Sequence, residues 1–297
     1  MDLQDYRREL DTLDDGLLEL FCRRMEIAAQ IGAYKKEKGL PVLDAARERE
    51  KLLDIAKKSP EGMDDYTVSL FSLIMELSRS CQNRLSGTEN ALTEQIREAI
   101  DSTSQLFPPM ATVACQGAAE DASRLACDRL FKLPNILGFT SYDAVFSAVE
   151  KGLCQYGVVP VENSAAGSVN AVYDLMMQHN FHIVRSVRVQ SDKGSDYTRY
   201  ICFARGLEIY PGADRTSLML VLPNRMGSLY KLLSRFYALG INLSKLESRP
   251  IPERNFEFMF YFDLDTSIYS PAFLQLMGEL DTVCEEFHYL GSYSEVV

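Results

Sequence analysis

The sequence has few of the residues from which metal sites and disulfide frameworks are built. Its seven cysteines are scattered, odd in number and without a CxxC pair, which fits a reducing compartment and argues against a zinc site. The three histidines form no ligand-like cluster, and we interpret His179 and His182, which flank a predicted strand start, as structural. We therefore expect neither a metal nor another cofactor.

Long apolar runs and an excess of positive charge are also missing. No apolar run approaches membrane-spanning length, and the charged N-terminus has no signal-peptide core. A formal net charge of −11 opposes binding to the phosphates of a nucleic acid. These absences predict a cytoplasmic protein without membrane or nucleic-acid partners, and 297 residues leave room for two or three domains.

A long Pro-free stretch, residues 3–38, carries cations among hydrophobic residues at helical spacing, which predicts a helix with positive charge on a buried face. In such a helix Arg24 and Lys35 lie within about 20° of each other and about 16 Å apart along the axis, so both can reach one small anion. Arg7 lies about 25 Å further back and is turned by about 100°, so a functional Arg7 must serve a partner chain. The alternative is that Arg7 and Arg24 are ordinary solvated charges.

Two further helices are predicted to add polar groups of other types. On the second, Asp44, Arg47 and Glu48 fall at i, i+3 and i+4, which places an arginine between two carboxylates. On the third, Ser78 and Gln82 fall at i and i+4 beside an apolar run. Together these groups could bind a hydroxylated dicarboxylate, although each pair alone also fits a surface salt bridge or an exposed polar face.

Residues 1 to about 85 resemble the all-helical chorismate mutase domain, through "RRELDTLDDGLLELFCRRMEIAAQIGAYKK", "PVLDAAREREKLL" and "LIMELSRSCQ". The positions that hold the residue types of that family are Arg7, Arg24, Lys35, Asp44, Arg47, Glu48, Ser78 and Gln82. The resemblance implies that the three arginines bind the substrate carboxylates, Arg7 from a partner chain, and that Lys35 and Gln82 donate hydrogen bonds to the ether oxygen. The other three would fix the ring hydroxyl and nearby groups, with Glu48 counted among the catalytic residues.

This chemistry needs no nucleophile. Chorismate rearranges to prephenate in one intramolecular pericyclic step, so the protein has to hold the compact conformer and stabilise negative charge on the ether oxygen. Arginine suits the first task because its planar fork binds carboxylates in a bidentate manner. Three helices enclose such a ligand poorly, so we expect an intertwined homodimer or a higher homo-oligomer.

Beyond a polar linker at residues 86–110, strands and helices alternate as in a parallel-sheet α/β lobe. Residues 111–207 resemble one lobe of prephenate dehydratase, through "GVVPVENSAAGSVNAVYDL" and "DYTRYICFAR". The resemblance implies an active-site remnant, with Thr198 at the position of the catalytic hydroxyl. This remnant comprises Glu162, Asn163, Ser164, Gly167, Thr198 and Arg199.

Two departures from that family predict that dehydration is lost. Where the family has a second α/β lobe, residues 191–196 alone join the two flanking strands, so the wall opposite Thr198 would be missing. The family's Gly-x-x-Gly-Ser-Tyr-Ser-His turn is replaced by "GAAEDASR", whose Glu120 and Asp121 would repel a dicarboxylate. The alternative is an active bifunctional chorismate mutase/prephenate dehydratase that makes phenylpyruvate.

Residues 208–297 read as strand, helix, strand, strand, helix, strand, the βαββαβ ferredoxin-like pattern. They resemble the ACT regulatory domain attached to prephenate dehydratases, through "GSLYKLL" and "LESRP". The resemblance implies a phenylalanine site that comprises Gly227, Ser228, Leu229, Glu247, Ser248, Arg249 and Pro250. The alternative is a domain that only dimerises. Phenylalanine can regulate the mutase only by binding its competent and less competent arrangements unequally.

The sequence thus predicts a multidomain α + α/β protein with a three-helix mutase domain, a linker, one dehydratase-like α/β lobe without its second lobe, and an ACT domain. The predicted function is a chorismate mutase of phenylalanine biosynthesis that takes chorismate to prephenate and responds to phenylalanine. A non-catalytic phenylalanine sensor is a third hypothesis, against which the complete mutase constellation argues.

Overall fold

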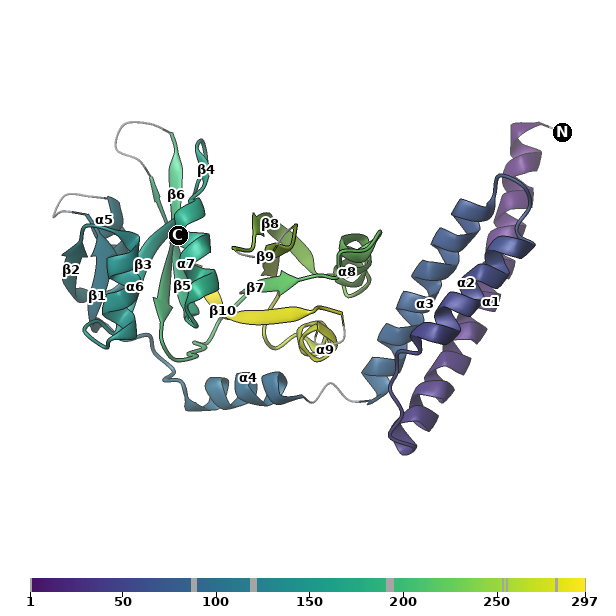
Figure 1. The fold of residues 1–297 in the computed structure, drawn as a ribbon, viewed down its shortest axis with the longest axis horizontal. Helices are drawn as coiled ribbons and strands as arrows, with labels where there is room; N and C mark the ends of the chain where they lie inside the picture. Colours follow the sequence, from purple (N-terminus) through teal and green to yellow (C-terminus); the bar gives the residue numbers. More distant parts are fainter. Residues whose placement is uncertain are drawn as a thin grey trace. The chain divides into compact units, whose positions relative to one another are not determined.

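The computed structural model describes residues 2–86, 90–117, 122–190, 195–252, 254, 256–280 and 283–296, shown in Figure 1. Two compact units divide the chain. The first comprises residues 1–88 and 229–239, and the second comprises residues 89–228 and 240–297. Glu120 and Asp121 of the altered turn lie outside the described residues, as do positions 191–194 of the short connection.

The first unit is helical and contains α1 (Leu3–Glu37), α2 (Ala45–Lys58), α3 (Asp64–Ser86) and all but the first residue of α8 (Ser228–Ala238). The carboxylate of Asp2 caps α1, and no proline interrupts the helix that follows. Both α1 and α2 pack against α3. The three-helix arrangement predicted from the breaks in the sequence is confirmed.

Helices α1 and α3 approach each other closely at Gly32. A Cβ atom at this position would lie 3.1 Å from Cα, Cβ and Cγ of Gln82, so a larger side chain would push α3 away. This contact lies at the end of α1 where the predicted mutase residues gather. The glycine therefore contributes to the position of Gln82.

The expectation of a buried cationic face along the whole of α1 is wrong for the single chain. Within α1, Ala28 and Gly32 alone are buried. The helix has 35 residues and α3 has 23, so α3 cannot cover its full length. Large apolar side chains that α1 leaves exposed are Leu3, Tyr6, Leu10, Leu13, Leu17, Leu18, Leu20, Ile27, Ile31 and Tyr34.

The second unit begins with α4 (Ala91–Ser102) and continues into a mixed sheet. Strands β1 (Met110–Gln116), β2 (Leu133–Phe139) and β3 (Tyr156–Asn163) are parallel, in the order β2-β1-β3. The structure therefore confirms a parallel sheet for this half of the lobe.

The other half of the lobe differs from the prediction. Strand β6 (Tyr197–Ala204) lies between β3 and β5 (His182–Gln190) and is antiparallel to both. The cause is the short connection at residues 191–196, because parallel neighbours need a crossover of about a dozen residues or more. The short connection that replaces the second lobe of the family thus makes β5 and β6 an antiparallel pair.

Helices cover both faces of this sheet. Helix α5 (Ala122–Leu130) packs on one face, and α6 (Tyr142–Glu150) and α7 (Asn170–Gln178) pack on the other. Val158 belongs to the apolar cluster of the first face and Val159 to that of the second, as the alternation of side chains along a strand requires. A two-residue strand, β4 (Gly167–Ser168), pairs with the end of β3.

The last strands form the predicted βαββαβ pattern. Strands β7 (Arg215–Val221), β8 (Asn242–Pro250), β9 (Phe258–Asp265) and β10 (Glu286–Val296) are antiparallel in the order β10-β7-β9-β8, with α9 (Pro271–Leu280) before β10. This strand order is that of a ferredoxin-like fold. The proposed boundary at residue 207 stays a prediction.

Strand β10 joins this sheet to the lobe, because its last residues pair with β5 in parallel. Gly291 lies at an irregularity in the pairing of β10 with β7. It has a φ of +129°, and a Cβ there would lie 2.4 Å from the carbonyl oxygen of Ile183. Only glycine fits this crossing, which gives one continuous sheet behind the site described below.

Candidate functional sites

The first candidate site lies between α1 and α3. The guanidinium of Arg24 donates to Ser78 Oγ and, at 3.4 Å, to the carbonyl oxygen of Ile74. Burial lowers the pKa of Arg24, while the negative charge of Glu48 opposes this shift, so Glu48 lies within electrostatic reach. The structure therefore brings Arg24, Ser78 and Glu48 together from three helices.

Gln82 and Lys35 lie near the other end of this cluster. Gln82 follows Ser78 by one turn of α3 and is buried, and its Oε1 has no hydrogen-bond partner among the described residues. Lys35 Nζ donates to the carbonyl oxygen of Val42 at 2.6 Å. Arg24 and Lys35 thus bond to uncharged oxygens, a hydroxyl or a carbonyl.

The start of α2 corrects one prediction. Arg47 does not lie between two carboxylates: its guanidinium pairs with Glu50 at 2.6 Å on the surface, and Asp44 Oδ1 accepts a hydrogen bond from the backbone N–H of Arg47 at 3.0 Å. Asp44 is the N-cap residue of α2, so its carboxylate satisfies a backbone donor that the helix leaves free. Glu48 instead contacts Arg79 of α3.

Two residues of this region were not predicted. Arg79 contacts both Glu48 and Glu76, and Glu76 is buried. The signal was an acid and a base at i and i+3 on either side of Ser78.

Arg7 is exposed at the far end of α1 and has no ion pair among the described residues, so its role across a dimer stays a prediction.

The second candidate site lies where β3 and β6 pair. The register sets Glu162 beside Arg199 and Asn163 beside Thr198, and Asn163 Nδ2 donates to Thr198 Oγ1 at 2.9 Å. Ser164 Oγ accepts from the backbone N–H of Tyr197 at 2.9 Å. Gly167, with a φ of +81°, begins β4. The structure thus brings the predicted dehydratase remnant together.

Strands β7 and β8 contribute to a cavity of about 560 Å³ at this site. Its lining residues are Arg129, Glu162, Ser164, Arg188, Tyr197, Arg199, Arg215 and Ser244. Arg215 is on β7 and Ser244 is on β8. We expected the side opposite Thr198 to be open because the second lobe is missing. This expectation is wrong in part, because the C-terminal strands β7 and β8 line part of the cavity.

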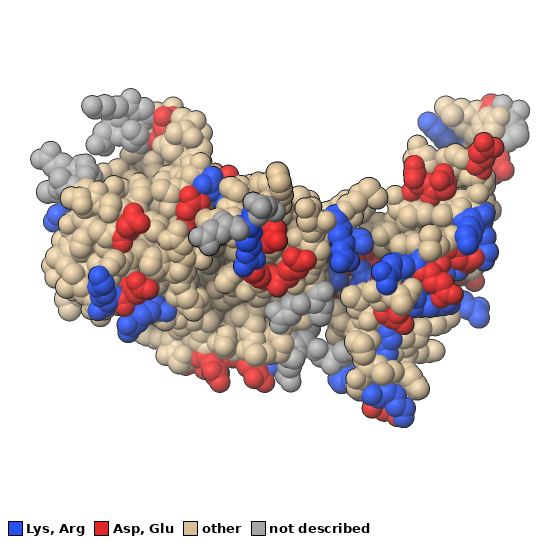
Figure 2. All heavy atoms as spheres, viewed as in Figure 1, with Lys and Arg blue, Asp and Glu red and all other residues tan. Residues whose placement is uncertain are grey.

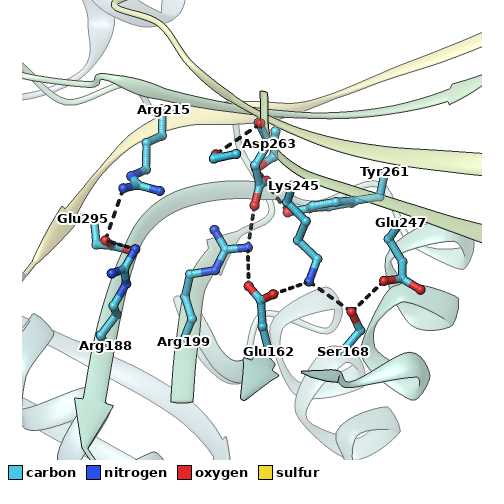
Figure 3. A network of polar contacts seen from close by, with 12 residues as sticks. Glu162, Ser168, Arg188, Arg199, Arg215, Lys245, Glu247, Tyr261, Asp263 and Glu295 are labelled. Carbon is cyan, nitrogen blue, oxygen red and sulfur yellow. Dashed lines mark hydrogen bonds and ion pairs between the residues drawn. The ribbon is translucent and has the colours of Figure 1, made fainter. Parts of the chain in front are cut away.

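Acidic side chains compensate three of the four arginines that line this cavity (Figure 3), and the fourth, Arg129, donates to the carbonyl oxygen of Arg188 at 2.7 Å. Arg199 is buried and contacts Asp263 and, at 3.4 Å, Glu162. Burial alone would lower the pKa of Arg199, but the interactions with Asp263, Tyr293 and Tyr261 together outweigh it and raise the pKa. Arg188 and Arg215 share the carboxylate of Glu295 at 3.0 and 3.4 Å.

The predicted effector motif on β8 contacts the lobe. Glu247 accepts from Ser168 Oγ at 2.7 Å, and Arg249 forms a bidentate pair with Asp174 of α7 at 2.9–3.1 Å. Lys245 Nζ reaches Glu162 at 2.9 Å and Ser168 at 3.0 Å. Sequence reasoning did not find Lys245, Ser168 or Asp174, because these pairings depend on how β8 meets the lobe.

The remaining motif residues have simpler positions. Gly227, with a φ of +81°, precedes Ser228 and Leu229 at the start of α8. Ser248 and Pro250 lie on β8. On the face shown in Figure 2, acidic and basic side chains are intermixed over the helices.

The described residues also bear on metal binding, membrane insertion and disulfide formation. Across the described part of the chain, no group of three or more His, Cys, Asp or Glu side chains could hold a metal ion. None of the helices in that part is both long and apolar enough to cross a bilayer. All seven cysteines are free thiols.

The fold and the two sites define a multidomain enzyme with a helical mutase-type domain and a dehydratase-type lobe. Residues 6–83 match the family described as chorismate mutase type II, and residues 113–203 match prephenate dehydratase. The bifunctional chorismate mutase/prephenate dehydratase of Aquifex aeolicus is 24% identical, and the match covers 100% of this chain and 99% of that protein. The chain thus carries a chorismate mutase type II domain and a prephenate dehydratase domain, and it is similar over its whole length to a bifunctional chorismate mutase/prephenate dehydratase.

The alignment with the Aquifex protein spans 357 positions against 297 residues here, so the relative carries segments with no counterpart in this chain. The prephenate dehydratase of Streptococcus mutans is 27% identical, with a TM-score of 0.56, over 63% of this chain and 99% of that one. The prephenate dehydratase of Arthrobacter aurescens in complex with L-Phe, 18% identical, shares the fold with a TM-score of 0.53 over 62% of this chain and 90% of that one.

Proposed function

We propose that this chain is a chorismate mutase of phenylalanine biosynthesis, regulated by phenylalanine, in which dehydration is lost. The observation that carries the mutase assignment is the cluster of Arg24, Ser78 and Glu48, with Gln82 one turn further along α3. We place the enzyme in the cytoplasm, a location that the seven free thiols support.

The roles follow from the chemistry of the rearrangement. Arg24 binds a substrate carboxylate and gives up its bond to the Ser78 hydroxyl, because a charge-assisted bond is stronger than one to a neutral oxygen. Lys35 and Gln82 donate to the ether oxygen, where negative charge develops in the transition state. Glu48 and Ser78 orient the ring hydroxyl, so the compact conformer is held in place.

A second copy of the chain would complete the site. The exposed apolar side chains of α1 need a partner surface, and Arg7 lies on this same unpaired part of the helix. In a dimer of antiparallel α1 helices, Arg7 of one copy reaches the Arg24 end of the other. This arrangement uses the third arginine as a carboxylate ligand and buries the apolar face.

Loss of dehydration is supported by the ion pairs of the second site. Arg199 is buried between Asp263 and Glu162, so its charge is already compensated and it cannot serve as a free carboxylate ligand. The longer alignment of the Aquifex relative is in keeping with the absence of a second lobe here.

Regulation by phenylalanine is supported by the two motifs of the C-terminal domain and by the Arthrobacter relative, whose structure holds L-Phe. In this chain Glu247 and Arg249 bond to Ser168 and Asp174 of the lobe. A bound amino acid would compete for these groups, because its ammonium and carboxylate suit Glu247 and Arg249. Binding would therefore loosen β8 from the lobe.

The experiment is to identify the product. The purified chain is incubated with chorismate, with and without phenylalanine, and prephenate is separated from phenylpyruvate under conditions that avoid acid. We expect prephenate alone, formed at a phenylalanine-dependent rate. If neither prephenate nor phenylpyruvate forms, the mutase assignment is wrong, which leaves the phenylalanine sensor as the remaining hypothesis.

A bifunctional enzyme is the second candidate. The cavity of about 560 Å³ and the bond between Asn163 and Thr198 favour it, because both lie at the dehydratase remnant. Phenylpyruvate formed by the wild-type chain but not by Thr198→Ala, with Ser141→Ala as a control, would establish this alternative.

A further inference from the structure

Four charged side chains form a continuous chain of ion pairs in the helical unit. Glu48 of α2 contacts Arg79 Nη1, Arg79 Nη2 contacts Glu76 Oε2, and Glu76 Oε1 contacts Arg235 Nε. All four residues belong to the same compact unit, since that unit includes residues 229–239. The chain of contacts therefore runs from a predicted substrate residue to α8.

The burial of these side chains increases towards α8. The exposed fraction is 28% for Glu48, 13% for Arg79, and 4% for both Glu76 and Arg235. Charges so far from water interact strongly with one another, and each needs its partner to offset the loss of hydration. A change at Arg235 must therefore be felt at Glu76 and Arg79.

Each inner member is shared between two neighbours. The two carboxylate oxygens of Glu76 go to two different arginines, and the two terminal nitrogens of Arg79 go to two different carboxylates. When Arg235 moves away, Glu76 keeps Arg79 as a partner and attracts it more strongly. Arg79 is then drawn from Glu48.

Glu48 matters because it faces the mutase cluster as well as Arg79. Its charge acts on Arg24, which contacts Ser78. We propose that Arg79 is a positioning residue that holds Glu48 in the mutase site, and that Glu76 and Arg235 make this position depend on α8. This inference rests on the proposed function, and it names the route by which that site is regulated.

The route also has a direction. Helix α8 begins within the first effector motif, "GSLYKLL", and the second, "LESRP", lies on the strand that follows, β8. A ligand that shifts α8 weakens the contact of Arg235 with Glu76. The predicted consequence is a mutase with weaker substrate binding, which is inhibition through KM.

The test compares Arg235→Met with Arg225→Met, an exposed arginine just before α8. We expect Arg235→Met to raise the KM for chorismate by about tenfold, within the range typical of coupled sites, to change kcat little, and to lose the response to phenylalanine. Arg225→Met should behave as the wild type. A wild-type KM in Arg235→Met would overturn the inference.

The double variant Glu76→Leu/Arg235→Leu removes the two most deeply buried charges together, which avoids a lone buried charge that could prevent folding. Arg79 then has Glu48 as its remaining partner in the ion-pair chain, so we expect the KM to return to within about twofold of the wild type while the phenylalanine response stays lost. Adding Arg79→Met to the double variant should raise the KM for chorismate. Adding Arg79→Lys instead should raise the KM less, because lysine keeps the positive charge beside Glu48. A double variant that still responds to phenylalanine would overturn the route through Arg235.

These outcomes separate the inference from the proposed function. A wild-type chain without prephenate formation overturns both. If the wild-type mutase is active but does not respond to phenylalanine, the proposed regulation and the role of Arg235 in it are wrong. The KM of Arg79→Met then tests whether Arg79 positions Glu48. Circular dichroism and the assembly state of each variant show that it is folded.

Discussion

The mutase site and the dehydratase-like site both hold residues of their family, but the partners of their cations differ. In the helical unit, Arg24 and Lys35 bond to a hydroxyl and a carbonyl oxygen. At the second site, Arg199 bonds to two carboxylates, and Arg188 and Arg215 share a third. A neutral partner yields to a substrate carboxylate, whereas a buried carboxylate partner does not.

The comparison teaches that a motif residue is available for chemistry only when its charge is not already compensated. By sequence, Arg199 fits the dehydratase family as well as Arg24 fits the mutase family. By structure, Asp263 reaches Arg199 from β9, a strand about 60 residues further along the chain, so the arginine has become part of the core. We expect the two sites to respond to mutation in opposite ways, one in activity and the other in stability.

The largest effect is expected from Asp263→Ala in the second site. The change would leave Arg199 buried with Glu162 as its remaining carboxylate partner, 3.4 Å away, and should lower the free energy of unfolding by about 3–5 kcal/mol. Urea denaturation measures this loss. Asp265→Ala is the control, because its carboxylate is 38% exposed and 3.8 Å from Arg215, and it should cost less than about 1 kcal/mol.

A second prediction concerns activity in the helical unit. Lys35→Ala should lower kcat for prephenate formation by about 10²–10³-fold, because it removes a donor to the ether oxygen, while stability changes little. Lys36→Ala, the next residue of the same helix, is the matched control. Equal losses in both variants would mean that the effect is structural, and the contrast between the two sites would disappear.

Local features of the fold were predictable because local residues determine them. The end of α1 near Lys38, the breaks before α2 and α3, and the βαββαβ order followed from periodicity and breakers. The antiparallel course of β6 was also within reach of the sequence, since a connection of six residues at 191–196 is too short for a crossover. The prediction of a parallel sheet overlooked that length.

Side-chain partners were less predictable because they depend on register and on capping. Arg47 was expected between Asp44 and Glu48, but Asp44 caps the helix and Glu48 contacts Arg79. Lys245 and Asp174 met their partners across about 75 residues or more, through the packing of β8 against the lobe. No local pattern in the sequence contains that information.

A third prediction probes the contact between the effector motif and the lobe. Asp174→Asn should release Arg249 and lower the Kd for phenylalanine by about fivefold, because the ligand no longer competes with the internal carboxylate. Isothermal titration calorimetry measures the Kd. Asp143→Asn, an exposed acid on α6, should leave it unchanged. A weaker affinity in Asp174→Asn would show that this contact supports the effector site instead of blocking it.

The smallest expected effect is a pH dependence of stability that arises in the second unit. All three histidines lie in the second unit, and burial lowers the pKa of His182 below its usual value of 6.5. The unfolded chain therefore binds this proton at a higher pH than the folded chain, so the stability conferred by neutral His182 is complete above about pH 6.5 and declines as the pH falls below it. The measurement is the urea midpoint of unfolding at about pH 7 and at about pH 5.5. We expect the midpoint to fall less on acidification in His182→Gln than in the wild type. His288→Gln, which replaces an exposed histidine, should match the wild type. Equal acid sensitivity in wild type and His182→Gln would assign the pH dependence to the carboxylates of the polar network.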